Sequence, residues 1–217
     1  MGVFRGLVGT VAGRVGARYN ARTMDSLAKL FGNPARLKLL RLFLFNEDAF
    51  YTSADASFRV KANKELTKKE LAVLVTAGVI KKKQGKKDDR TVAGFIANKK
   101  YQHFQALQTF LRESTDVSDV SILTTLRKAG TLRVVALSGM FTGAIETKVD
   151  LMVVGDKLEE KSLANAIHSL EAELGQELRY AYFTTEEFKY RVGVYDRLVR
   201  DVFDYPHRTI LDRIGAG

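Results

Sequence analysis

The chain has 217 residues, of which 46% are hydrophobic, and a formal net charge of +10. This length and apolar content suffice for two domains of ordinary size, each with a packed core. The absence of cysteine excludes disulfides, thiol catalysis and thiolate metal sites, and it is typical of proteins of the reducing cytoplasm, where we expect this chain. No run of about 18 consecutive apolar residues occurs, so we expect no membrane span.

The positive charge is concentrated in the first half of the chain. Residues 1–115 contain 22 Lys and Arg against 9 Asp and Glu, whereas residues 116–217 contain 13 against 16. A basic region joined to a weakly acidic one is expected when only one of two domains meets a polyanion. With the polar stretch Ser114–Ser118 as the boundary, the sequence predicts domains at residues 24–115 and 116–217.

Residues 1–23 form a basic segment that contains four arginines and no acidic residue. Its apolar residues recur at helical spacing, but its glycines weaken a helix. We interpret it as a tail. The alternatives are an arm that lies along nucleic acid, and a targeting or membrane-surface segment.

The first domain is predicted to contain helices followed by a hairpin. The apolar pattern indicates a short helix from Asp25 to Phe31 and a strongly apolar helix from Pro34 to about Asn46. Thr52 or Ser53 is expected to cap a third, short helix.

A lysine-rich helix and a basic hairpin follow. The helix begins at Asn63, buries its leucines on one side and ends at Gly78. Two short strands, Val79–Lys83 and Thr91–Phe95, then predict a hairpin, and a further helix is expected to end near Arg112.

This order of elements carries a resemblance to a known family. The run SLAKLFGNPARLKLLRLFLFN, the helix pair after it and the run LAVLVTAGVIKKK resemble the winged helix-turn-helix of prokaryotic transcriptional regulators, over residues 25–100. The resemblance implies a recognition helix in the DNA major groove and a wing beside phosphates. A winged helix used only for protein contacts or dimerisation is the alternative.

The resemblance also assigns DNA-binding residues. On the recognition helix these are Asn63, Lys64, Lys68 and Lys69, and on the wing they are Lys82, Lys83, Lys86, Lys87 and Arg90. A lysine can contact a guanine edge or a phosphate, and Asn63 could pair with adenine.

The second half alternates strands and helices, which predicts an α/β arrangement. Ser118 is expected to cap a helix that ends near Lys128, and buried strands are expected at Leu132–Leu137 and Val149–Val154. A helix from Glu159 to Leu174, stopped by Gly175, a strand to Phe183 and a short helix capped by Thr184 or Thr185 complete the prediction. The later aromatic residues are expected to complete this core, and a dimer surface made by an exposed subset of them is the alternative; they are Phe188, Tyr190, Tyr195, Phe203 and Tyr205.

The segment LSGMFTGAIETKVDLMVVGD resembles the signature of the minimal nucleotidyltransferase fold, and the resemblance extends over residues 119–214. It implies a small domain with a mixed sheet. In this family a Gly-Ser turn contacts triphosphate oxygens, and two carboxylates hold the magnesium ions that bridge the phosphates.

The chain departs from this pattern at the reacting centre. Lys148 stands where the first carboxylate is expected, Asp150 stands at the second, and the turn reads Ser138-Gly139. A protonated lysine has no lone pair for a metal ion. We therefore expect a degenerate cleft without catalytic residues, metal or cofactor, in which Asp150 caps a loop or pairs with Lys148.

Together these patterns predict an α+β protein in which a winged helix-turn-helix domain precedes a nucleotidyltransferase-like domain. The predicted function is a DNA-binding transcriptional regulator whose second domain, a pseudoenzyme, acts as a sensor or dimerisation platform. Its expected partners are double-stranded DNA, a second copy of the chain, and a protein or nucleotide-like ligand at the second domain. The alternatives are an active nucleotidyltransferase that recruits Glu146 or Glu177, and a toxin-antitoxin-like protein that binds a partner chain.

Overall fold

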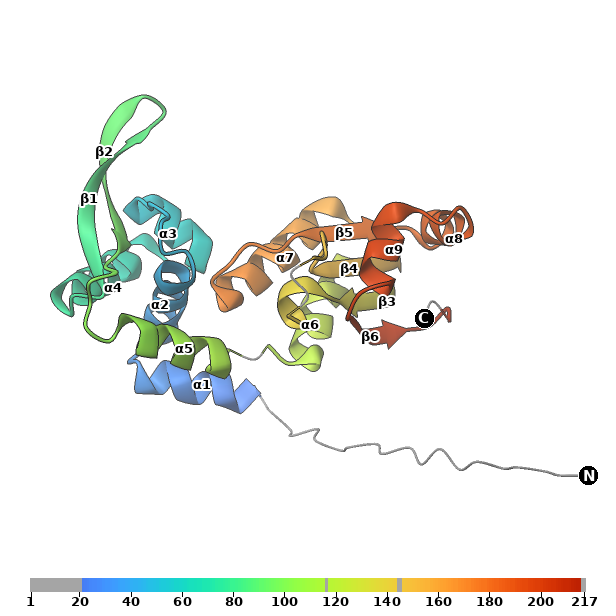
Figure 1. The fold of residues 1–217 in the computed structure, drawn as a ribbon, viewed down its shortest axis with the longest axis horizontal. Helices are drawn as coiled ribbons and strands as arrows, with labels where there is room; N and C mark the ends of the chain where they lie inside the picture. The colour runs from blue at the N-terminus through green and yellow to red at the C-terminus, as the bar shows by residue number, and fades with distance from the viewer. Residues whose placement is uncertain (1–20, 116, 144–145, 216–217) are drawn as a thin grey trace, which may run out of the picture.

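The computed structural model describes residues 21–115, 117–143 and 146–215, and almost all of the predicted basic tail lies outside this range. The described residues form an α+β structure with a two-stranded and a four-stranded sheet, which confirms the α+β part of the predicted fold. Figure 1 shows two lobes side by side. We call residues 21–115 the N-terminal lobe and residues 117–215 the C-terminal lobe. No helix in these ranges is long and apolar enough to cross a membrane.

The N-terminal lobe is built around one apolar helix. Its elements are α1 (Ala21–Leu30), α2 (Pro34–Phe45), α3 (Ser53–Val60), α4 (Lys64–Thr76), β1 (Ile80–Lys87), β2 (Arg90–Ala97) and α5 (Phe104–Ser114). Helix α2 contacts α1, α3, α4 and α5, and its leucine and phenylalanine side chains are buried. Because nine of its twelve residues are buried, α2 forms the centre of this lobe and the other helices pack around it.

Side-chain caps define where α2, α3 and α4 begin. Asn33 and Asn63 accept hydrogen bonds from the first turns of α2 and α4, and Thr52 forms a capping box with Asp55 at the start of α3. Gly78, with φ of +77°, follows the end of α4 as predicted.

The hairpin β1–β2 is longer than predicted and projects away from the lobe (Figure 1). Lys87 pairs with Arg90, so Asp88 and Asp89 form a two-residue turn with φ of 48° and 58°. Near its base, Tyr51 forms an isolated antiparallel β-bridge with Phe95. The ring of Phe50 packs against the hairpin at Gly85 and Gly94. A Cβ at Gly94 would lie 2.4 Å from this ring.

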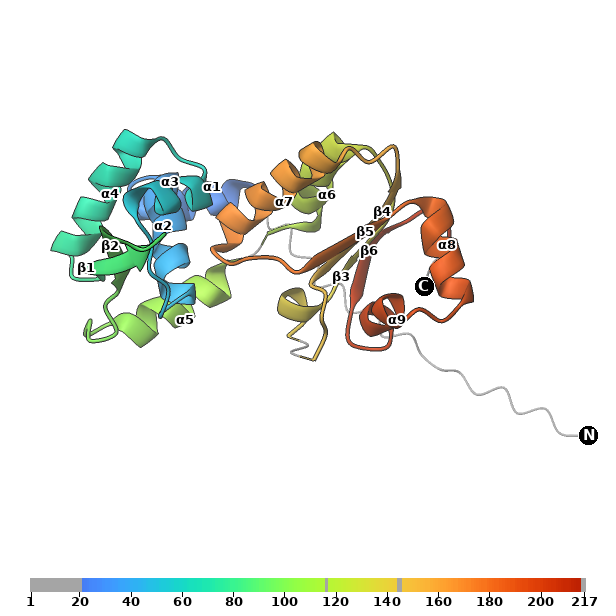
Figure 2. The ribbon, with the colours of Figure 1, turned by 90° about the horizontal axis from the view of Figure 1, so that it is seen from above.

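The C-terminal lobe is a mixed sheet between two pairs of helices. Its elements are α6 (Asp119–Leu126), η1 (Arg127–Ala129), β3 (Thr131–Leu137), η2 (Gly139–Phe141), β4 (Leu151–Asp156), α7 (Glu160–Leu174), β5 (Tyr180–Phe183), α8 (Thr185–Gly193), α9 (Arg197–Phe203) and β6 (Arg208–Asp212). The strand order is β5-β4-β3-β6, with β4 and β5 parallel and the other pairs antiparallel. Figure 2 shows α6 and α7 on one face and α8 and α9 on the other.

The end of the chain differs from the prediction. The sequence reasoning assigned no element after the helix that contains Phe188, but α9 and β6 are present there. Phe188 is buried as expected, whereas Tyr190 and Tyr195 are exposed. The aromatic residues of this region therefore only partly complete the core.

The two lobes contact each other where the end of α7 meets α2 and α3. Arg41 Nη1 donates a 3.0 Å hydrogen bond to the Glu173 carbonyl, and Asn46 Nδ2 donates a 2.7 Å bond to the Gly175 carbonyl. Gly175 has φ of +75°, and a Cβ there would lie 2.5 Å from the Cβ of Arg41. A glycine is required because backbone from both lobes approaches so closely here.

Candidate nucleic-acid interface and the Asp150 site

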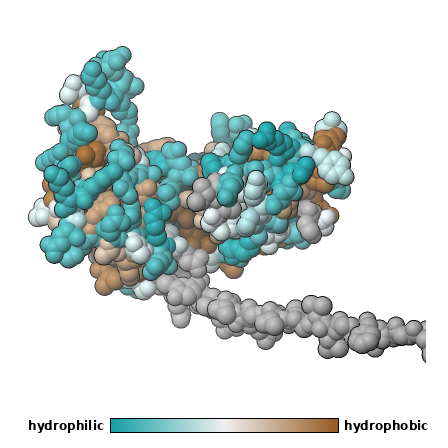
Figure 3. Space-filling view, viewed as in Figure 1, coloured by the Kyte–Doolittle hydropathy of each residue, from teal (hydrophilic) through white to brown (hydrophobic). Residues whose placement is uncertain are grey.

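Helix α4 presents lysines on the outside of the N-terminal lobe. Lys64, Lys68 and Lys69 are exposed, whereas Leu71 and Leu74 are buried against the core. Lys64 and Lys68 are four residues apart, so they lie one turn apart on one face of the helix. The hydrophilic surface in Figure 3 extends over α4 and along the hairpin.

A buried carboxylate fixes the orientation of this lysine face. Glu70 is 2% exposed, and its Oε2 accepts a 2.6 Å bond from Arg36 Nε, while its Oε1 accepts a 2.8 Å bond from Asn33 Nδ2. These partners lie at the start of α2, where the helix dipole also favours a negative charge. Sequence reasoning missed this residue, because an acid next to two lysines looks like part of an exposed face.

Asn63 has a different position from the one predicted. It precedes α4 as the N-cap, and its Oδ1 accepts a 2.8 Å hydrogen bond from the Leu66 amide. A bidentate contact with adenine uses the same oxygen as an acceptor. The structure therefore gives Asn63 a role in starting the helix, and pairing with adenine would compete with that role.

The cations of the hairpin lie on both of its faces. Successive strand residues alternate sides, so Lys82 and Lys86 lie on one face, while Lys83, Lys87 and Arg90 lie on the other. All five side chains belong to exposed residues. Lys81, which sequence reasoning did not select, is also exposed.

Lys87 is engaged within the N-terminal lobe. Its Nζ forms an ion pair with Asp55 at the start of α3, and the hydrogen bond that Lys87 donates to this carboxylate raises the pKa of Lys87. Burial opposes ionisation of Asp55, but the bonds from Lys87 and Thr52 together hold its pKa below the ordinary value. Lys87 therefore serves partly to hold the hairpin near α3.

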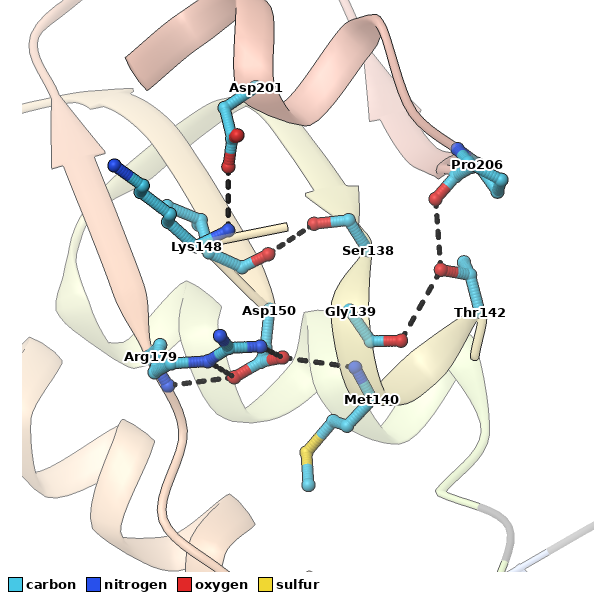
Figure 4. A network of polar contacts seen from close by, with 10 residues as sticks. Ser138, Gly139, Met140, Thr142, Lys148, Asp150, Arg179, Asp201 and Pro206 are labelled. Carbon is cyan, nitrogen blue, oxygen red and sulfur yellow. Dashed lines mark hydrogen bonds and ion pairs between the residues drawn. The ribbon is translucent and has the colours of Figure 1, made fainter. Parts of the chain in front are cut away.

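In the C-terminal lobe, Asp150 lies at the start of β4 and is surrounded by hydrogen-bond donors (Figure 4). Its Oδ2 accepts bonds from Arg179 Nε at 2.9 Å and from the Arg179 amide at 3.0 Å. Its Oδ1 accepts bonds from Arg179 Nη2 at 2.7 Å and from the Met140 amide at 2.9 Å. The carboxylate thus receives four hydrogen bonds from its own chain, and they occupy the oxygens that a metal ion would need.

These bonds determine the charge state of the pair. Burial opposes ionisation of Asp150, yet the hydrogen bonds from Arg179 and the Met140 amide outweigh it and lower the pKa of Asp150. The hydrogen bond with Asp150 correspondingly raises the pKa of Arg179. The site therefore contains a fixed, internally neutralised ion pair at neutral pH.

The remaining residues of the predicted cleft support this arrangement. The Ser138 hydroxyl donates to the Val149 carbonyl, and Gly139 has φ of +51°. A Cβ at Gly139 would lie 2.1 Å from Asp150 Oδ1, so the turn approaches the carboxylate instead of leaving room for a phosphate. The prediction that Asp150 caps a loop is confirmed by its bond with Met140.

The predicted pairing of Asp150 with Lys148 is wrong. Figure 4 shows the Lys148 side chain extending away from Asp150, and the Lys148 amide instead donates a 2.6 Å bond to Asp201 on α9. The partner of Asp150 is Arg179, which is 29 residues away along the chain. No local pattern marks Arg179, because it enters the site only when β5 lines up beside β4.

Among the residues that the structure describes, no group of three or more His, Cys, Asp or Glu side chains could hold a metal ion. Glu177, one of the two carboxylates considered for an active nucleotidyltransferase, forms an ion pair with Arg59 of the N-terminal lobe. Glu146, the other one, is exposed.

No protein-family model, curated protein or solved structure matches this chain.

Proposed function

We propose that this protein is a DNA-binding transcriptional regulator. In this proposal the N-terminal lobe acts as a winged helix-turn-helix, and the C-terminal lobe is a nucleotidyltransferase-like domain that has no transfer activity. The observation that carries the proposal is the exposed lysine face of α4 beside a projecting, cation-rich hairpin. Helix α4 follows α3 after a short turn at Lys61, which has φ of 52°, an order of elements that supports a helix-turn-helix.

The proposed mode of binding places α4 in the major groove. Lys64 and Lys68 would contact base edges or phosphates, and the hairpin would lie along the adjacent backbone with Lys82, Lys83, Lys86 and Arg90 near phosphates. Glu70 would keep the lysine face turned outward through its bonds with α2. The acidic turn at Asp88 and Asp89 is expected to remain outside the closest contacts, because like charges repel.

Titration of a labelled DNA duplex with the full chain at several salt concentrations tests this function. Each lysine–phosphate contact contributes about 0.9 to the slope of log affinity against log salt. The double variant Lys64→Ala/Lys68→Ala should bind more weakly and reduce the slope by about 2. The matched control Lys161→Ala/Lys189→Ala removes the same charge from exposed positions on α7 and α8. Equal effects of the two double variants on affinity and salt slope would show that α4 is not the recognition helix.

The absence of transfer activity rests on the bonding of Asp150. Transfer through two metal ions needs carboxylate oxygens that are open to the metal. Here those oxygens accept bonds from Arg179 and the Met140 amide. Incubation with labelled nucleoside triphosphates, magnesium and candidate acceptors should give no transfer. Transfer that Asp150→Asn abolishes would overturn this part of the proposal.

A further inference from the structure

A cavity of about 460 Å³ lies between the two lobes. Its walls come from the ends of α2 and α5 in the N-terminal lobe, and from η2, the end of α7 and the start of β6 in the C-terminal lobe. The notch between the lobes in Figure 3 contains hydrophobic surface. The volume falls within the range of about 300–1,000 Å³ that is typical of small-molecule sites.

Two arginines from different lobes face this cavity. Arg112 lies in the last turn of α5, and its guanidinium lies 4.9 Å from the centre of the Phe45 ring. Arg208 begins β6, and its side chain is 50% exposed although Nη1 forms an ion pair with Asp119. Gln176 adds an amide, and none of the described residues that line the cavity is acidic. The lining thus favours an anion.

Apart from Thr115, the rest of the lining is apolar. Phe45, Met140 and Phe141 provide two aromatic rings and a flexible thioether, which suit a flat or aliphatic body. An organic anion with an apolar body would fit both parts of the wall. Its charged group would contact the guanidinium groups, and its body would pack against the aromatic rings.

This cavity is separate from the predicted nucleotide cleft. Ser138, Gly139, Lys148 and Asp150 are not among the residues that line it. Met140 belongs to both sites, because its backbone amide donates a hydrogen bond to Asp150 and the residue also lines the cavity. Since the described lining offers no carboxylate for a metal ion, a phosphate here would have to be held by guanidinium groups, without the magnesium that a nucleotidyltransferase uses.

We propose that the cavity between Phe45, Arg112, Met140, Phe141 and Arg208 binds a small organic anion with an aromatic or apolar body, without a metal ion. Arg112 and Arg208 hold the charged group, so the bound anion touches both lobes. This site goes beyond the proposed function, and its occupancy is measured in the absence of DNA. A failure here is therefore distinguishable from a failure of DNA binding.

The test uses 8-anilinonaphthalene-1-sulfonate, a fluorescent aromatic anion, with the full chain. It should bind at one site per chain, phenyl phosphate should displace it, and the neutral benzyl alcohol should not. Arg112→Met and Arg208→Met retain most of the side-chain bulk and remove the charge, so each should weaken binding about tenfold, as expected for the loss of one charge-assisted hydrogen bond. Arg127→Met, at an exposed arginine of η1 outside the cavity, is the matched control.

Three results would overturn the proposal. One is the same affinity in both cavity variants and in the control, with all three folded by circular dichroism. Another is displacement by benzyl alcohol as readily as by phenyl phosphate, which would show that charge has no part in binding. The third is loss of binding on addition of a chelator, which would show that a metal ion holds the anion.

Discussion

The α4–hairpin surface and the Asp150 site use charge in opposite ways. On α4 the lysines are exposed, and the charged group that fixes the helix, Glu70, is buried beneath them. At Asp150 the carboxylate forms an ion pair with Arg179 and accepts two further hydrogen bonds from backbone amides. Charges that extend into solvent are available to a partner, whereas charges that satisfy each other stabilise the fold. This difference is why we propose DNA binding for one lobe and no catalysis for the other.

The largest expected effect comes from crowding the Asp150 site. Gly139→Ala would place a Cβ 2.1 Å from Asp150 Oδ1 at a φ of +51°. Left-handed backbone and overpacking together should lower the free energy of unfolding by roughly 2–5 kcal/mol, measured by urea denaturation. At Gly143, with φ of +75°, a Cβ would meet nothing within 4 Å, so Gly143→Ala should cost only about 1–2 kcal/mol. Equal losses would show that Gly139 does not pack closely against the carboxylate.

The next largest effect is expected at Glu70, the buried carboxylate beneath the exposed lysines of α4. Glu70→Gln keeps the shape of the side chain and removes the charge that Arg36 contacts, so the free energy of unfolding should fall by about 1.5–3 kcal/mol. Glu65→Gln, at an exposed position of the same helix, should change it by less than about 0.5 kcal/mol. A stability loss at Glu65 as large as that at Glu70 would argue against a specific role for the buried carboxylate.

Acid should weaken the Asp150 site selectively. Because the folded pKa of Asp150 is lowered, its stabilisation is fully present above the unfolded value of about 3.9 and is lost as pH falls through the lower, folded pKa. Asp150→Asn should therefore reduce the free energy of unfolding by about 1.5–3 kcal/mol at pH 7 and by progressively less below about pH 4. Denaturant titrations across pH measure this difference.

Asp204→Asn is the control, since Asp204 forms an exposed ion pair with Arg200. That pair should contribute less than about 1 kcal/mol at any pH. A difference between wild type and Asp150→Asn that is independent of pH would contradict the charged state assigned to Asp150.

The smallest effect distinguishes cations within the hairpin. Lys82 lies on the face opposite Lys87, and only Lys87 forms an ion pair with Asp55. Lys82→Ala should reduce the salt slope of DNA binding by about 0.9, and Lys87→Ala by less, because the Lys87 charge is shared with Asp55. The duplex titration resolves the two variants. A larger effect of Lys87→Ala would mean that DNA displaces Asp55.

Local signals predicted the elements well, because caps and stops act over a few residues. Thr52, Ser118 and Thr184 each accept a hydrogen bond at the start of a helix, and Gly175 ends α7 with φ of +75°. Asn63 also lies at a helix start, but its capping role was overlooked when it was assigned to the groove. A residue type that caps helices and also reads bases gives no local indication of which role it has.

The contacts that define the two sites could not be predicted, since each joins distant parts of the chain. Glu70 meets Arg36 across 34 residues, and Asp150 meets Arg179 across 29. These pairs depend on how α4 packs on α2 and on how β5 lines up with β4. The sequence pattern showed that one of the two expected carboxylates is absent. Only the fold shows that Arg179 binds the other carboxylate, Asp150.

Hydrogen exchange of the full chain, alone and saturated with duplex DNA, tests the division between the lobes most directly. Slower exchange is expected for amides of α4 and of the hairpin at Ile80–Lys87 and Arg90–Ala97, the residues that would face the DNA. Amides around Ser138, Asp150 and Arg179 should exchange at the same rate with and without DNA. Protection confined to that second group, with α4 and the hairpin unchanged, would contradict the proposal that the N-terminal lobe binds DNA.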